Sequence, residues 1–101
     1  MSAHVVITGG AGAIGRALAA ALRRAQPSVR LTLVDRDEAG LHEAQQALGG
    51  ATAIAVWDLA ELDLLPARVE SLGVIDVLVN NAGFMELRSL TATPWALGEK
   101  L

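Results

Sequence analysis

Short aliphatic segments alternate with amphipathic segments along almost the whole chain, and this alternation limits the fold more than any other feature. The aliphatic segments are rich in Val, Ile and Leu, as strands covered on both faces are. In the segments between them, apolar residues recur every three or four positions, which predicts helices. The predicted strands are 4–8, 30–34, 53–57 and 74–79, and the predicted helices are 14–25, 37–48, 62–72 and a last one opening at Thr93-Pro94.

Strands and helices that alternate at this spacing predict an α/β fold with a parallel sheet and right-handed crossovers. By analogy with doubly wound sheets, we expect the four strands to lie in the order 3-2-1-4. Pro66 lies inside the third helical pattern, so that helix is expected to begin near it. No internal repeat or linker interrupts the chain, so residues 1–101 are expected to form one domain. The last helix has room for only two turns, and we expect the domain to be incomplete at its C-terminus.

The first predicted strand runs into a glycine-rich turn, Thr8-Gly9-Gly10-Ala11-Gly12-Ala13-Ile14-Gly15, which opens the first helix. Gly10, Gly12 and Gly15 satisfy the spacing G-x-G-x-x-G in the strand–turn–helix context that dinucleotide binding requires. Glycines there allow a tight turn, a close approach of backbone to pyrophosphate, and close packing of helix on sheet. The amides and the dipole at the helix start favour phosphate. Gly-rich turns of this kind also occur for structural reasons alone.

Asp35 supplies the second half of this fingerprint. It ends the second predicted strand, 20 residues after Gly15, where a carboxylate can accept from ribose hydroxyls. An aspartate at a strand end is otherwise often only a turn former. Both features together predict a Rossmann-like domain that binds a dinucleotide.

Four segments together resemble the short-chain dehydrogenase/reductase family. They are the turn from Thr8 to Gly15, Asp35 after Leu-Thr-Leu-Val, Asp58-Leu59 after the third strand, and Asn80-Asn81-Ala82-Gly83 after the fourth. The last is the most specific, and the resemblance covers essentially the whole chain.

The resemblance implies a role for each of these positions. Thr8 would brace the turn, and the turn residues would lie under the pyrophosphate, with the Ile14 amide as a donor. Asp35 would hold the adenosine ribose, and Asp58 would contact the adenine amino group beside the Leu59 backbone. Asp58 could instead be a helix N-cap, and Asn80 and Asn81 could be turn formers only. The predicted cofactor-binding residues are Thr8, Gly9, Gly10, Gly12, Ile14, Gly15, Asp35, Arg36, Asp58, Leu59, Asn80, Ala82 and Gly83.

The turn departs from the family pattern at Ala13, where glycine is usual. The alternative spacing T-G-x-x-G-x-x-G fits Thr8, Gly9, Gly12 and Gly15 and resembles the extended, epimerase-like branch of the family. The Asn-Asn-Ala-Gly segment favours the other branch, and we give it more weight. The cofactor is expected to be NAD, because Asp35 would repel a 2′-phosphate. NADP is the alternative, because Arg36 can accept that phosphate.

The family's catalytic Ser and Tyr-x-x-x-Lys are expected beyond position 101. The sequence has no tyrosine, and its single lysine is Lys100. We therefore expect no catalytic residue here, and read the chain as the dinucleotide-binding part of an NAD(P)-dependent oxidoreductase acting on an alcohol or carbonyl. The alternatives are a stand-alone nucleotide-binding or regulatory module and a truncated epimerase-like enzyme. The full-length parent is expected to form homo-oligomers, and the fragment to self-associate.

Composition excludes other classes of function. The net charge of −3 argues against a nucleic-acid surface, which needs clustered Lys and Arg. The pair Arg23 and Arg24 is interpreted as a solvated helix face. With no cysteine and only two histidines, no metal site is expected. No signal peptide or membrane span is visible, so a cytoplasmic location is expected.

Overall fold

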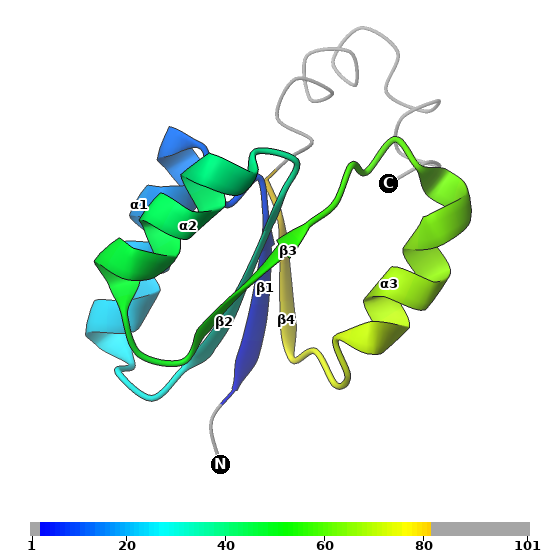
Figure 1. The fold of residues 1–101 in the computed structure, drawn as a ribbon. Coiled ribbons are helices and arrows are strands. Elements are labelled where there is room, and N and C mark those ends of the chain that lie inside the picture. Colours follow the sequence, from blue (N-terminus) through cyan, green and yellow to red (C-terminus); the bar gives the residue numbers. More distant parts are fainter. Residues whose placement is uncertain (1–2, 82–101) are drawn as a thin grey trace, which may run out of the picture.

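The computed structural model describes residues 3–81, which form a parallel four-stranded sheet with helices on both faces (Figure 1). The helix expected at Thr93-Pro94 lies outside these residues. The elements in chain order are β1 His4–Thr8, α1 Ala13–Ala25, β2 Arg30–Asp35, α2 Glu38–Leu48, β3 Thr52–Val56, the 3-10 helix η1 Leu62–Leu64, α3 Leu65–Ser71 and β4 Val77–Asn80.

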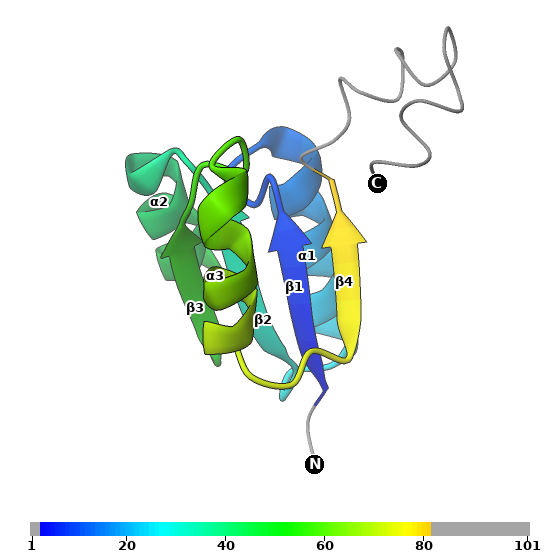
Figure 2. The ribbon, with the colours of Figure 1, turned by 90° about the vertical axis from the view of Figure 1, so that its right-hand side faces the viewer.

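The strand order is β3-β2-β1-β4, with every neighbouring pair parallel, which confirms the predicted fold and order. The first strand in the sequence is therefore interior, and β4 is an edge of this sheet. Thr8 at the end of β1 is in register with Val34 of β2 and with Asn80 of β4. Because all strands run the same way, the residues that follow them gather at one end of the sheet (Figure 2).

The core lies between the sheet and the pair α1 and α2, which cover one face, while α3 lies on the other (Figures 1 and 2). It consists of aliphatic side chains that alternate along β1 and β2 and of small or aliphatic residues from the helices. The buried residues of this cluster are Val5, Ile7, Ala19, Val29, Leu31, Leu33, Leu41 and Ala44. By contrast, α3 buries none of its residues, so α1 and α2 carry the packing that holds the glycine-rich turn.

Strand β4 begins later than the sequence predicts, at Val77 and not at Val74. The reason is a set of polar contacts with His4. The Asp76 carboxylate accepts from the His4 amide (2.7 Å), and the Asp76 amide donates to the His4 carbonyl (2.9 Å). The Val74 carbonyl lies 2.8 Å from Nδ1 of the buried His4 imidazole, whose Nε2 lies 2.7 Å from the Thr32 hydroxyl. These contacts use residues 74–76 to close the loop, and the ladder starts after them.

The other boundaries agree to within a few residues. Strand β3 begins and ends one residue early, and Trp57 still donates its amide to the Asp35 carbonyl (2.9 Å). Pro66 lies in the first turn of α3, as expected, where its missing N–H costs nothing.

The interpretation of Arg23 as a solvated residue is wrong. Its guanidinium is half-buried and contacts the Val29 carbonyl and the Thr52 hydroxyl, whereas Arg24 is exposed.

Candidate functional site

The predicted site residues that the structure describes gather at the carboxyl end of the sheet, where the glycine-rich turn joins β1 to α1. The turn is fixed by its own backbone. The Gly10 amide donates to the Val34 carbonyl at the end of β2 (3.0 Å), and the Gly12 amide donates back to the Gly9 carbonyl (3.1 Å). Gly9 itself has φ of 69°, a conformation that favours glycine. The turn therefore holds a defined position above the β1–β2 pair.

Gly15 allows α1 to pack directly on this turn. A Cβ at position 15 would lie 2.3 Å from the Gly9 carbonyl oxygen and 3.0 Å from the Gly10 Cα. Gly15 is buried, while a Cβ at Gly12 would lie at an ordinary 3.5 Å from the same oxygen. The close approach predicted for a helix-packing glycine is thus found at Gly15.

No side chain caps the start of α1. Gly12 is its N-cap residue and provides no side-chain hydrogen bond to the first turn. The first amides of a helix have no carbonyl one turn earlier within that helix. Those of Ala13, Ile14 and Gly15 are therefore available to an anion, which the positive end of the helix dipole also favours. Ile14 itself is 55% exposed.

Asp35 ends β2 next to the turn, and both of its carboxylate oxygens accept backbone amides. Oδ2 accepts from Ala11 (3.0 Å), and Oδ1 accepts from Asp37 (3.1 Å). Asp35 is therefore a turn former, as one interpretation of the sequence expected. Each carboxylate oxygen has a further lone pair, so these bonds also orient the group and leave it able to accept from a hydroxyl. Arg36, the next residue, is exposed.

The end of β4 is tied to the end of β1 by side chains. The Thr8 hydroxyl lies 3.1 Å from Asn80 Oδ1 and 3.3 Å from the Val79 carbonyl. The side-chain Nδ2 of Asn81 donates to the Gly9 carbonyl (3.3 Å), which adds a second link to the turn. Asn80 and Asn81 thus connect β4 to the glycine-rich turn. They are therefore not turn formers only, which was the alternative left open by the sequence. Ala82 and Gly83 lie outside the described residues.

Asp58 and Leu59 follow β3 and approach no other predicted site residue in the described contacts. The Asp58 carboxylate accepts from the Ala60 amide (2.9 Å) within its own turn. The N-caps of the following helices are Glu61 and Leu64, so the alternative that Asp58 caps a helix is wrong. Asp58 reaches the site end of the sheet because it follows a parallel strand.

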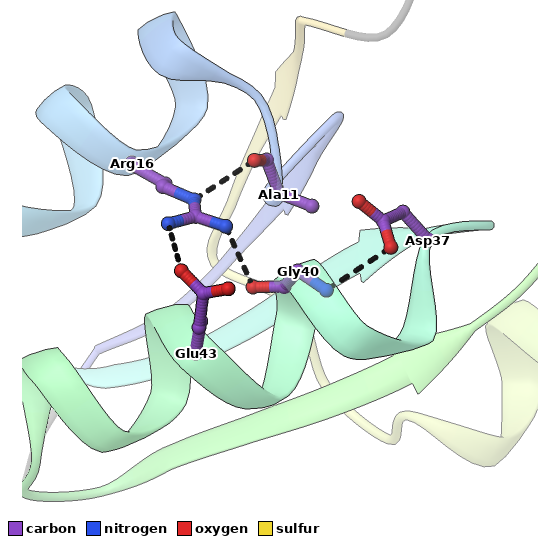
Figure 3. Close-up of polar contacts among 5 residues, drawn as sticks. All are labelled: Ala11, Arg16, Asp37, Gly40 and Glu43. Atoms are coloured by element: carbon purple, nitrogen blue, oxygen red, sulfur yellow. Dashed lines mark hydrogen bonds and ion pairs between the residues drawn. The ribbon is translucent and has the colours of Figure 1, made fainter.

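Arg16 is a contributor that sequence reasoning missed. Its Nε donates to the Ala11 carbonyl (2.8 Å), and its Nη2 donates to the Gly40 carbonyl in α2 (3.0 Å). Its Nη1 pairs with Glu43 at 3.3 Å (Figure 3). The available signal was an arginine directly after Gly15, in the first turn of a helix, but no motif indicated its partners.

The described residues lack the features of two other kinds of site. Within residues 3–81, no group of three or more His, Asp or Glu side chains is placed to hold a metal ion. Over the same range, none of the helices has the length and apolar character needed to span a membrane.

Comparison with known proteins agrees with this geometry. Residues 3–96 match the model of a family described as short chain dehydrogenase. L-rhamnose 1-dehydrogenase (NAD(P)(+)) of Azotobacter vinelandii is 41% identical over 100 residues, covering 89% of this chain and 39% of that protein. D-xylose 1-dehydrogenase of Caulobacter vibrioides is 40% identical over 84 residues, covering 79% of this chain and 33% of the other.

Solved structures share the fold. An NAD+-bound xylitol dehydrogenase has a TM-score of 0.63 at 29% identity, covering 81% of this chain and 34% of the other. A 3-oxoacyl-[acyl-carrier protein] reductase from Brucella melitensis in complex with NAD has a TM-score of 0.60 at 37% identity, covering 80% and 33%. The chain thus spans about one third of these two structures and 39% of the L-rhamnose dehydrogenase.

Proposed function

Because this chain belongs to the short-chain dehydrogenase/reductase family, we propose that its described residues form the cofactor-binding part of an NAD(P)-dependent oxidoreductase that acts on an alcohol or carbonyl group. The observation that carries the proposal is that the start of α1, beside Asp35, has no side-chain cap. Amide donors for phosphate and an oriented carboxylate for ribose lie on either side of one glycine-rich turn.

The residues present fit a pyrophosphate at the start of α1. Gly9 and Gly12 put no side chain over the turn, and Gly15 brings the helix against it. In the proposal, the amides of the first helical turn, including that of Ile14, bind the pyrophosphate oxygens. An α1 of 13 residues has its full dipole behind these amides.

Asp35 would bind the adenosine ribose. Its carboxylate is held by Ala11 and Asp37, so it does not need to reorganise before it accepts a hydroxyl. The same negative charge disfavours a 2′-phosphate, which supports NAD over NADP as the preferred cofactor. Arg36, exposed next to it, would soften that preference.

The other residues would complete the cofactor site from the neighbouring strands. Asp58, after β3, would contact the adenine, with the Leu59 backbone beside it. Asn80 would contact the second ribose while Thr8 holds its Oδ1 (3.1 Å). Ala82 and Gly83 are proposed to extend this contact on the family pattern alone.

The bound dinucleotide would supply hydride transfer, and the chain would bind and orient it. A proton relay is a separate requirement of carbonyl reduction, and no tyrosine in this sequence can provide one. We therefore propose that the residues of the relay lie outside these 101 positions. A cytoplasmic location and a homo-oligomeric parent stay predictions from the sequence.

Titration with NADH and NADPH tests the proposal directly. We expect saturable binding of NADH, followed by nicotinamide fluorescence, and weaker binding of NADPH. Nicotinamide mononucleotide serves as the control because it lacks the adenosine ribose and the pyrophosphate bridge, and it should compete poorly. A chain that is folded by circular dichroism and binds neither dinucleotide would contradict the proposal.

A further inference from the structure

Five residues around the glycine-rich turn form a closed hydrogen-bonded ring, which we call the Arg16 ring; Figure 3 draws every member except Asp35. Its members come from the turn, α1, the end of β2, and the N-cap and first turn of α2. They are Ala11, Arg16, Asp35, Asp37 and Gly40.

The ring can be followed bond by bond. Arg16 Nε donates to the Ala11 carbonyl (2.8 Å), and the Ala11 amide donates to Asp35 Oδ2 (3.0 Å). Asp35 Oδ1 accepts from the Asp37 amide (3.1 Å), and Asp37 Oδ1 accepts from the Gly40 amide (3.0 Å). The Gly40 carbonyl accepts from Arg16 Nη2 (3.0 Å) and closes the ring.

Arg16 is the only member whose side chain joins α1 to α2 in this ring. A guanidinium can donate from separate nitrogens in a fixed planar fork, which suits two backbone carbonyls on different elements. Its side chain is 37% exposed, and the contacts to Ala11 and Gly40 are on its part-buried side. The third contact, with Glu43, is an exposed ion pair that contributes little.

At Gly40 the members of the ring are in close contact. A Cβ there would lie 2.5 Å from Asp37 Oδ2 and 2.9 Å from the Ala11 Cβ. The start of α2 therefore rests on Ala11 with no room for a methyl group. Movement of Ala11 away from Asp35 requires the Arg16 contacts to break or α2 to shift.

We propose that Arg16 is a positioning residue for cofactor selectivity: it fixes Ala11, and through the Ala11 amide it orients the Asp35 carboxylate toward the adenosine ribose. This inference rests on the proposed function. In this proposal Arg16 influences the preference between NADH and NADPH without having to contact the adenosine 2′ position, where the two cofactors differ.

A direct electrostatic role for Arg16 would have the opposite sign. Loss of a positive charge near the site would weaken NADPH more than NADH, because NADPH carries the extra phosphate charge. Loss of positioning would weaken NADH more, because the ribose contact depends on Asp35. Arg16→Lys separates the electrostatic effect from the positioning effect. It keeps the positive charge but cannot donate to the Ala11 and Gly40 carbonyls at the same time as the planar guanidinium does.

The test measures NADH and NADPH affinity for Arg16→Lys together with the hydrogen exchange rate of the Ala11 amide without cofactor. We expect the ratio of NADH to NADPH affinity to fall roughly threefold to thirtyfold, which lies within the range of coupling between residues in one network. The Ala11 amide should exchange roughly threefold to tenfold faster, because its bond to Asp35 opens more often. Arg24→Lys, on the exposed face of the same helix, is the matched control and should change neither quantity.

A double-mutant cycle then decides whether Arg16 acts through Asp35. In an Asp35→Asn background, Arg16→Lys should no longer change the affinity ratio. Gly40→Ala, which strains the ring from α2, should lower the ratio in the same direction as Arg16→Lys and serves as the second variant. An unchanged or raised ratio in Arg16→Lys overturns the inference, as does an effect that persists without the Asp35 charge. Should the wild-type chain bind neither dinucleotide, the proposed function fails, and the Ala11 exchange rate still reports separately on the ring.

Discussion

Replacement of Gly15 by alanine should destabilise the glycine-rich turn by a calculable amount. The new Cβ would lie 2.3 Å from the Gly9 carbonyl oxygen, whereas carbon–oxygen contacts normally lie at about 3.3–3.6 Å. The helix and the turn must therefore separate by about 1 Å. The Gly9 carbonyl cannot easily yield, because it accepts from the Gly12 amide and from Asn81.

Overpacking of this size costs about 1–3 kcal/mol, and alanine recovers up to about 1 kcal/mol of helix propensity. Since the obstacle is backbone, we expect a net decrease of about 2 kcal/mol in the free energy of unfolding. Urea denaturation followed by circular dichroism measures it, at a protein concentration where sedimentation shows one species. NADH binding should weaken at the same time, because the first-turn amides move away from the turn.

Gly12→Ala is the matched control in the same turn. Its backbone has φ of −81°, which alanine adopts without strain, and its Cβ would meet only an ordinary contact at 3.5 Å. The gain from a stiffer unfolded chain and the loss of a glycine N-cap nearly cancel, leaving a change within about 0.5 kcal/mol. If Gly15→Ala were as stable as Gly12→Ala, the close approach would not limit this position, and the reasoning would be refuted.

Three further outcomes are expected. Asp35→Ala should raise NADPH affinity relative to NADH by roughly tenfold, because the like charge facing the 2′-phosphate is removed; an unchanged ratio by fluorescence titration would remove Asp35 from the ribose site. The 101-residue chain should oxidise no NADH in the presence of a ketone, and steady turnover sensitive to a substitution in this chain would overturn that expectation. The chain should self-associate through the edge strand β4, and Leu78→Lys, at a side chain 61% exposed, should shift sedimentation toward the monomer. Equal sedimentation of variant and parent as oligomers would place the contact elsewhere.

Much of the fold follows from the sequence because each signal is local. The aliphatic runs, the glycine-rich turn and Pro66 fix the element order, and the parallel topology follows from their alternation. The start of β4 was missed because it depends on contacts between His4 and residues 74–76, which are about 70 positions away. The β-branched pair Val74-Ile75 does not indicate from sequence that the Val74 carbonyl contacts the imidazole of His4.

The closeness of Asp35 to the glycine-rich turn was predictable for the same reason. Asp35 and the turn glycines stand at fixed offsets in one motif, so their neighbourhood could be expected. Arg16 could not be assigned a partner, because two of its acceptors are backbone carbonyls that look alike at every position. Arg23 was misjudged for a related reason: its contacts with Val29 and Thr52 depend on where β2 and β3 begin.

The interior place of β1 has a consequence for how the chain is made. On a ribosome, β1 emerges before β4, which pairs with one of its edges, and the contact from His4 to Asp76 spans 72 positions. At ordinary rates of synthesis, that edge of β1 waits roughly 4–14 seconds for its neighbour. During this time the nascent chain carries Val5, Val6 and Ile7 on a strand with one unpaired edge. A chain whose synthesis stops before Val77 would therefore keep this edge of β1 unpaired, and an unpaired aliphatic edge of this kind favours aggregation.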